Sequence, residues 1–178
     1  LVIGSGAIGL SAIQGARLAG ASTIIATDLE DDKLVLAKRV GATHTLNATH
    51  ESTLDFVRGV TSGNGVDCVL ESAGSNAAFR VAVESARPGG DVVWLGKVGV
   101  DDEVSFRWGS LMSEKRITRS SYGNPRPSRD FPALANAYLA GDLLLDELIT
   151  QRIDLTDINA GFDDLKNGRA IRSVIVFD

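Results

Sequence analysis

Residues 1–9, Leu-Val-Ile-Gly-Ser-Gly-Ala-Ile-Gly, place the glycine pattern GxGxxG directly after a short apolar run. In this pattern the first glycine permits a tight turn, the second lets the backbone approach a diphosphate, and the third lets a helix pack closely on a sheet. A helix that begins inside the pattern presents N–H groups that bind anions. Because glycine-rich turns also serve purely structural ends, the pattern needs further support. The candidate cofactor-binding residues of this stretch are Gly4, Gly6, Ala7, Ile8 and Gly9.

Beyond this pattern, short β-branched runs alternate with longer amphipathic stretches, which is typical of βαβ units and a parallel sheet. The predicted strands are 1–3, 23–27, 43–46, 66–71, 91–95 and 116–121. The predicted helices are 7–18, 31–39, 52–60 and 76–86, and glycine follows each within a few residues. The sequence therefore predicts an α/β fold with a doubly wound parallel sheet of the Rossmann type.

A linker is predicted at residues 122–128, which hold two of the four prolines. We expect a Rossmann domain at residues 1–124 and a C-terminal α+β segment at 125–178. The segment is predicted to contain a helix after Ser128, a strand at 149–153, a helix with Thr156 as its N-cap and a strand at 173–177. The first strand is shorter than usual and the chain does not begin with Met, so we expect a truncated strand and missing upstream sequence.

An acidic residue, Asp28, ends the second predicted strand, about 20 residues after the glycine pattern. A carboxylate at this position accepts hydrogen bonds from the ribose hydroxyls of adenosine, and it repels the 2′-phosphate of NADP. The following Leu29 and Glu30 supply no positive charge. A turn or helix-cap aspartate is the structural alternative. The pattern and the acid together favour a dinucleotide site that prefers NAD to NADP.

Two turns after predicted strands are further candidates for the site, because ligands of open α/β sheets bind outside the carboxyl ends of the strands. Without the glycine pattern, both would be ordinary connections between a strand and a helix. They contain Ser72, Ala73 and Gly74 after the fourth predicted strand, and Leu95, Gly96 and Lys97 after the fifth.

Composition and residue spacing exclude several function classes. With 18 basic and 23 acidic residues, the net charge of −5 disfavours a nucleic-acid partner, and no apolar run approaches the roughly 20 residues that span a bilayer. His44, His50 and Cys68 lack metal-ligand spacing, and we expect neither a metal site nor a catalytic residue in this chain. Cys68 lies in an apolar run and is predicted to be a buried structural thiol, which favours a reducing cytoplasm.

Several segments resemble the zinc-dependent medium-chain alcohol dehydrogenases. Residues 4–11, 19–21, 24–28 and 40–43 look like the coenzyme domain of that family, and 145–149, 158–162 and 168–172 are similar to its carboxyl-terminal segment. The aryl-alcohol and glutathione-dependent formaldehyde dehydrogenase branch looks most similar. By position, the resemblance implies that Ile8 lies against the nicotinamide, Lys33 near the adenosine ribose and Arg172 on the diphosphate. It also implies that Leu95, Lys97 and the backbone from Ser120 to Tyr122 flank the nicotinamide amide.

The resemblance implies the NAD-binding portion of an enzyme that transfers hydride between an alcohol or aldehyde and NAD. The C-terminal segment would belong to a GroES-like catalytic domain that is otherwise missing, and zinc is expected only in that N-terminal domain. A small-molecule alcohol or aldehyde and a homodimer or homotetramer are the expected partners. One alternative is a stand-alone NAD(H)-binding or regulatory module without redox chemistry, which the upstream sequence would distinguish. Another is a zinc-independent quinone reductase relative, which would prefer NADP.

Overall fold

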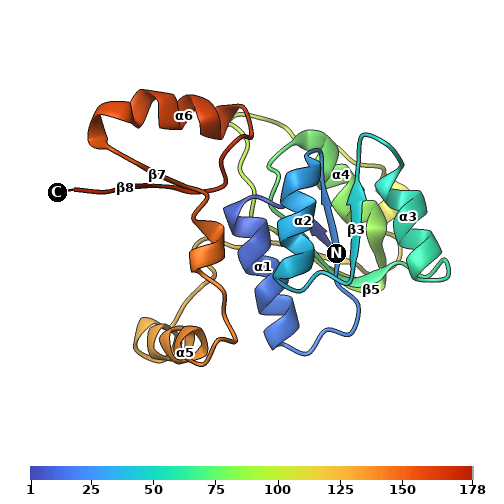
Figure 1. Cartoon of the computed structure of the whole chain (residues 1–178). Coiled ribbons are helices and arrows are strands. Elements are labelled where there is room, and N and C mark those ends of the chain that lie inside the picture. Colours follow the sequence, from blue (N-terminus) through green and yellow to red (C-terminus); the bar gives the residue numbers. More distant parts are fainter. Residues whose placement is uncertain (178) are drawn as a thin grey trace. The chain divides into compact units, whose positions relative to one another are not determined.

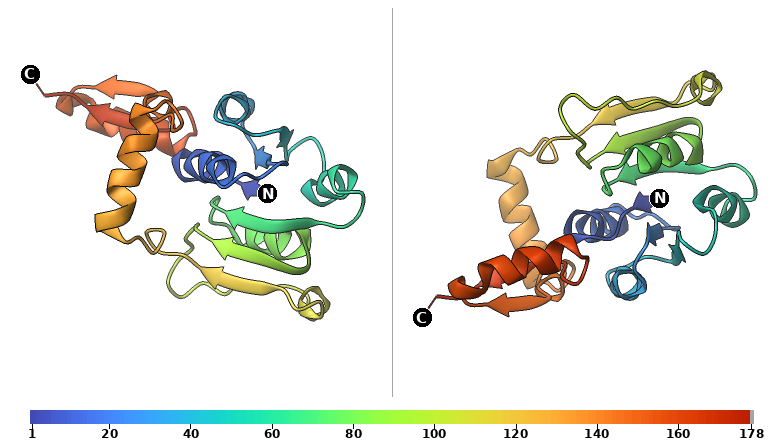
Figure 2. Two further views of the ribbon diagram at one scale, coloured as in Figure 1. Left: turned by 90° about the horizontal axis from the view of Figure 1, so that it is seen from below. Right: turned by 90° about the horizontal axis from the view of Figure 1, so that it is seen from above.

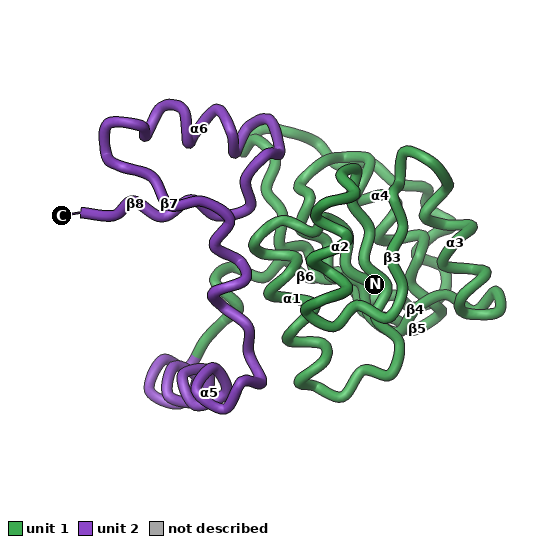
Figure 3. The backbone as a smooth tube through the Cα atoms, in the orientation of Figure 1, with its two compact units in different colours: residues 1–125 green, residues 126–178 purple. Residues whose placement is uncertain are grey.

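The computed structural model describes residues 1–177, and the chain divides into two compact units, Leu1–Pro125 and Arg126–Asp178 (Figure 3). Each unit has its own sheet (Figure 1). No helix within residues 1–177 is long and apolar enough to cross a membrane.

The first unit is built on a six-stranded, wholly parallel sheet with the strand order β3-β2-β1-β4-β5-β6. This order is that of the Rossmann fold, and it confirms the predicted fold class. The strands are β1 (Val2–Ile3), β2 (Ile25–Asp28), β3 (His44–Asn47), β4 (Val66–Glu71), β5 (Ala86–Trp94) and β6 (Arg116–Arg119).

Four helices cover the two faces of this sheet (Figure 2). The helices α1 (Ala7–Leu18) and α2 (Asp31–Arg39) lie on one face, and α3 (Thr53–Val60) and α4 (Asn76–Ser85) lie on the other. Their apolar sides supply the core: Leu10 and Ile13 of α1 and Ala82 and Val83 of α4 are fully buried. Burial of these side chains fixes the ends of the strands, and therefore the loops that follow them, on a rigid scaffold.

The strand order reverses between β1 and β4, which pair in parallel with Ile3 opposite Glu71. The chain leaves β1 toward one side of the sheet and leaves β4 toward the other, which opens a crevice at their carboxyl ends. Gly4 follows β1 and Ser72 follows β4, and the Ser72 hydroxyl donates to the Gly4 carbonyl at 2.9 Å. The glycine pattern therefore begins at the switch point of the sheet.

Some local predictions were wrong. Cys68 is exposed rather than buried. The α4 helix ends at Ser85 and β5 begins at once at Ala86, well before the predicted residue 91, because a register shift between Val66 and Cys68 extends the pairing around a bulge.

The second unit pairs two short parallel strands, β7 (Gln151–Ile153) and β8 (Ser173–Ile175), and carries two helices, α5 (Pro127–Leu139) and α6 (Ile158–Lys166). It is an α+β arrangement, as predicted. Thr156 does not cap α6, because it lies inside a 3-10 turn at Leu155–Asp157 and the helix begins at Ile158.

Candidate dinucleotide-binding site

The first and third glycines of the loop after β1 are held by close backbone contacts. Gly4 has a φ of +85°, and a Cβ added there would lie 2.8 Å from the Ala73 nitrogen. A Cβ added to Gly9 would overlap the Gly4 carbonyl oxygen. Gly4 cannot easily yield, because its N–H donates to the Thr27 carbonyl at 2.8 Å. Larger residues at both positions would therefore separate α1 from the sheet.

The second glycine, Gly6, leaves the start of α1 open. It is the N-cap residue, makes no side-chain cap, and a Cβ added there would meet no atom within 4 Å. The first turn of α1 contains no acidic residue, whereas α2 begins with Asp31 and Asp32. The first N–H groups of a helix lack partners within the helix and carry partial positive charge. The N-terminus of α1 can therefore bind an anion, because no acidic side chain in its first turn offsets this positive partial charge.

The carboxylate of Asp28 lies directly beside this loop. Its Oδ2 accepts from the Ser5 N–H at 2.6 Å, and its Oδ1 accepts from the N–H groups of Leu29 at 2.8 Å and Glu30 at 3.1 Å. Lys33 of α2 places its Nζ 3.8 Å from Oδ1. The acid at the end of β2 is thus fixed against the glycine loop and keeps 10% of its side-chain surface exposed.

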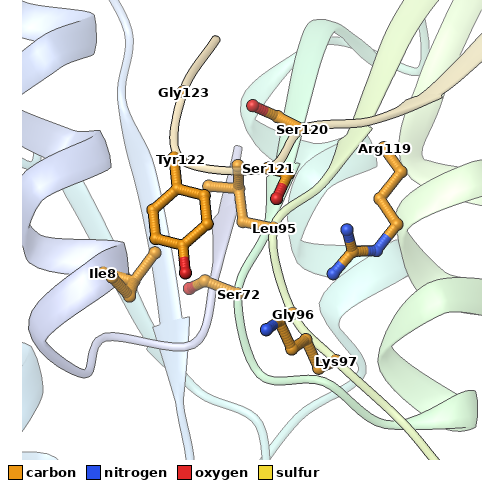
Figure 4. Close-up of a pocket in the computed structure, with 10 residues that line it drawn as sticks. All are labelled: Ile8, Ser72, Leu95, Gly96, Lys97, Arg119, Ser120, Ser121, Tyr122 and Gly123. Carbon is orange, nitrogen blue, oxygen red and sulfur yellow. The ribbon is translucent and has the colours of Figure 1, made fainter. Parts of the chain in front are cut away.

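A pocket of about 480 Å³ lies at the carboxyl edge of the same sheet (Figure 4). It is formed by the first turn of α1 and by the ends of β4, β5 and β6. Aliphatic and aromatic side chains line it together with serine hydroxyls and two basic side chains. Its lining residues are Ile8, Ser72, Leu95, Gly96, Lys97, Arg119, Ser120, Ser121, Tyr122 and Gly123.

Glu71, the last residue of β4, is a buried acid that directly precedes the pocket-lining residue Ser72. It is 0% exposed, and its Oε1 accepts from the Gly74 N–H at 2.8 Å. Its Oε2 has no hydrogen-bond partner among the described residues. A Cβ added to Gly96 would lie 2.6 Å from Oε2. Burial raises the pKa of this carboxyl, and the neighbouring backbone N–H groups oppose that rise only in part.

We expect Glu71→Gln to change how stability depends on pH. Above about 4.5, the ordinary carboxyl value, native Glu71 keeps a proton that the unfolded chain releases. Unfolding then releases a proton, so the free energy of unfolding falls as the pH rises toward the raised pKa. As the pH rises above 4.5 toward the raised pKa, the wild type should lose stability relative to Glu71→Gln, as measured by urea unfolding. The exposed Glu51→Gln serves as the control, and a stability difference that is constant with pH would contradict this expectation.

The structure gathers the predicted site residues of the first unit into two neighbouring groups. Asp28 and Lys33 meet beside the glycine loop, and six of the others line the pocket. Those six are Ile8, Ser72, Leu95, Gly96, Lys97 and Tyr122. Ala73 is not among the lining residues, but its nitrogen faces Gly4.

Arg172 lies in the second unit, immediately before β8. It is exposed, and its carbonyl oxygen accepts from the Thr150 N–H at 3.0 Å. Sequence reasoning overlooked Arg119 and Glu71. Each is the last residue of a strand in the parallel sheet. Because ligands of such sheets bind at the carboxyl ends of the strands, both residues could have been predicted as candidates.

Comparison with known proteins is consistent with this architecture. Residues 7–140 match the family profile of the zinc-binding dehydrogenases. The chain is 34% identical over 176 residues to alcohol dehydrogenase 1 of Pisum sativum, covering 98% of this chain and 46% of that protein. It is 37% identical over 179 residues to S-(hydroxymethyl)glutathione dehydrogenase of Komagataella pastoris, covering 98% and 47%.

A solved structure shares this fold over nearly the full length of the chain. Benzyl alcohol dehydrogenase from Acinetobacter calcoaceticus superposes with a TM-score of 0.94 at 29% identity, over 99% of this chain and 49% of that one. The chain therefore spans about half the length of the relatives that it matches.

Proposed function

The chain belongs to the zinc-binding dehydrogenase family, and from that membership we propose that it forms the NAD-binding part of an alcohol dehydrogenase. The resemblance noted in the sequence is thereby confirmed at the level of the family. The observation that carries the proposal is the hydrogen bond between the Asp28 carboxylate and the Ser5 N–H, which joins the sugar-binding acid to the glycine loop.

The residues present fit a dinucleotide. Gly6 leaves the mouth of α1 open, and Gly4 and Gly9 hold the helix close to the sheet, so a diphosphate can reach the N–H groups of the first turn. The Asp28 carboxylate would accept hydrogen bonds from the adenosine ribose. From its family position, Arg172 would bind the diphosphate as a charged partner.

The cofactor is proposed to be NAD rather than NADP. A 2′-phosphate would face the Asp28 carboxylate, and the only base that approaches this acid in the described residues is Lys33, which is already paired with it. Neither Leu29 nor Glu30 offers a positive charge. The charge on Asp28 thus favours a ribose hydroxyl over a phosphate at this position.

The pocket is proposed to receive the nicotinamide. When bound, this ring accepts or donates a hydride. Ile8 and Leu95 would contact its faces and exclude water, while the backbone of residues 120–122 and of Lys97 would orient its amide. Tyr122 has a φ of +54°, which is unusual for a bulky residue, and it lies in a turn in which the Asn124 N–H donates to the Ser121 carbonyl at 3.2 Å.

The chemistry of the intact enzyme extends beyond these residues. No group of three His, Cys, Asp or Glu side chains within residues 1–177 is placed to bind a metal ion. We propose that the zinc ligands lie in sequence outside this chain and that the substrate is a small alcohol or aldehyde. A cytoplasmic location, assembly as a homodimer or homotetramer, and a division into residues 1–124 and 125–178 are likewise proposed.

Titration of the chain with NADH and NADPH tests the proposal. Binding of NADH should saturate and enhance its fluorescence, and the Kd for NADPH should be about 10- to 100-fold higher, as expected for one charge-assisted interaction of about 1.5–3 kcal/mol. Failure of NADH to bind would overturn the proposal. A preference for NADPH would overturn the assigned role of Asp28.

A further inference from the structure

Two basic side chains in the pocket lack acidic partners. Lys97 follows β5 and Arg119 ends β6, and both are exposed to the pocket volume. None of the ten lining residues is Asp or Glu, and neither base takes part in an ion pair with any residue between 1 and 177. The pocket therefore concentrates positive charge in a chain whose net charge is −5.

Bases elsewhere in the same sheet are neutralised. Arg116, on the same strand as Arg119, bonds to both carboxylate oxygens of Asp91 at 2.6 and 2.7 Å. Arg87 pairs with Asp67 at 2.6 Å. Lys97 and Arg119 differ in this respect from Arg116 and Arg87. A guanidinium and an ammonium that face one space bind a carboxylate well, because the planar fork of arginine matches its two oxygens.

The position of these bases separates them from the proposed diphosphate site. Figure 4 shows Lys97 and Arg119 on the side of the pocket opposite Ile8, with Ser72 and Leu95 between them. Ile8 belongs to the first turn of α1, where the diphosphate is proposed to bind. A nicotinamide between Ile8 and Leu95 would therefore leave the two bases facing the substrate rather than the phosphates.

We propose that Lys97 and Arg119 bind a carboxylate on the substrate, so that the enzyme acts on an alcohol or aldehyde that also carries an acidic group. This inference rests on the proposed function, because it places the nicotinamide in the pocket. Lys97 and Arg119 then determine specificity: they hold the acidic end of the substrate, and the hydroxyl or carbonyl end is left to face the cofactor.

The test uses the 178-residue chain saturated with NADH and two rigid probes of equal shape, benzoate and benzamide. Their binding is measured by calorimetry. Benzoate should bind about tenfold more tightly than benzamide. Arg119→Gln and Lys97→Gln should each remove most of this preference. Lys38→Gln, which removes an exposed positive charge from the end of α2, should retain it.

The outcomes separate this inference from the proposed function. If NADH binds but benzoate binds no better than benzamide, the inference fails and the NAD-binding function stands. If Arg119→Gln raises the Kd for NADH as much as it raises the Kd for benzoate, the bases serve the cofactor diphosphate, and the inference also fails. If NADH does not bind at all, the proposed function fails first and the inference fails with it.

Discussion

Replacing Gly9 with alanine is expected to reduce NADH affinity by about 100-fold or more and to destabilise the first unit. The added Cβ would overlap the Gly4 carbonyl oxygen and would lie 2.8 Å from both the Gly4 carbonyl carbon and the Ser72 hydroxyl oxygen. Two of these three atoms are backbone, so no side-chain rotation relieves the contact. The start of α1 must shift away from the sheet instead.

The size of this effect follows from what the shift breaks. Overpacking of a close-packed contact costs about 1–3 kcal/mol of stability. Moving the first turn would also weaken the proposed hydrogen bonds between its N–H groups and the diphosphate, and each such bond is worth about 1.5–3 kcal/mol because one partner is charged. Loss of two such hydrogen bonds corresponds to at least about two decades in Kd, and the overpacking cost is an additional loss of folding stability.

Gly15→Ala is a matched control in the same helix. Gly15 lies in the interior of α1, and a Cβ added there would meet no atom within 4 Å. Alanine should stabilise the helix by about 0.5–1 kcal/mol at this position and leave the Kd unchanged. Thermal unfolding and NADH titration of the two variants measure both effects. A Gly9→Ala variant that binds NADH within twofold of the wild type would refute the role given to this contact.

The fold could be predicted because its signals are local. The apolar spacing of residues 7–18 and 31–39 predicted α1 and α2 with the bounds that the structure shows, and β4 likewise begins and ends where expected. Asp28 could be placed beside the glycine loop because β1 and β2 are neighbours in a parallel sheet, so their carboxyl ends meet at one edge.

The remaining differences arise from contacts between distant residues. The early start of β5 depends on its pairing with Val66, which the sequence around residue 86 does not encode. The exposure of Cys68 depends on which elements pack over that part of β4. An apolar run predicts a strand, but it does not predict which of its side chains other elements cover. Among residues 1–177, Oε2 of Glu71 has no hydrogen-bond partner and Arg119 has no acidic partner, and residue spacing cannot predict that a partner is lacking.

Replacing Asp28 with asparagine is expected to weaken NADH binding by about 10- to 100-fold. It should also lower the ratio of the Kd for NADPH to the Kd for NADH. Asparagine keeps one oxygen that can accept from a backbone N–H, but it loses the charge that strengthens the ribose hydrogen bonds and repels a 2′-phosphate. Its amide would face at least one of the N–H donors that now bond to the carboxylate, so some stability should be lost as well.

The ratio of the two Kd values separates recognition from general damage. A loosened glycine loop would weaken binding of NADH and NADPH equally, because the proposed site holds the diphosphate of both at α1. Loss of the Asp28 charge should instead weaken NADH binding and leave NADPH binding unchanged or tighter. Asp32→Asn removes an equal charge from an exposed position in the first turn of α2 and should leave the ratio unchanged. Equal losses for both cofactors in Asp28→Asn would mean that the carboxylate only braces the loop, and the preference for NAD would then need another source.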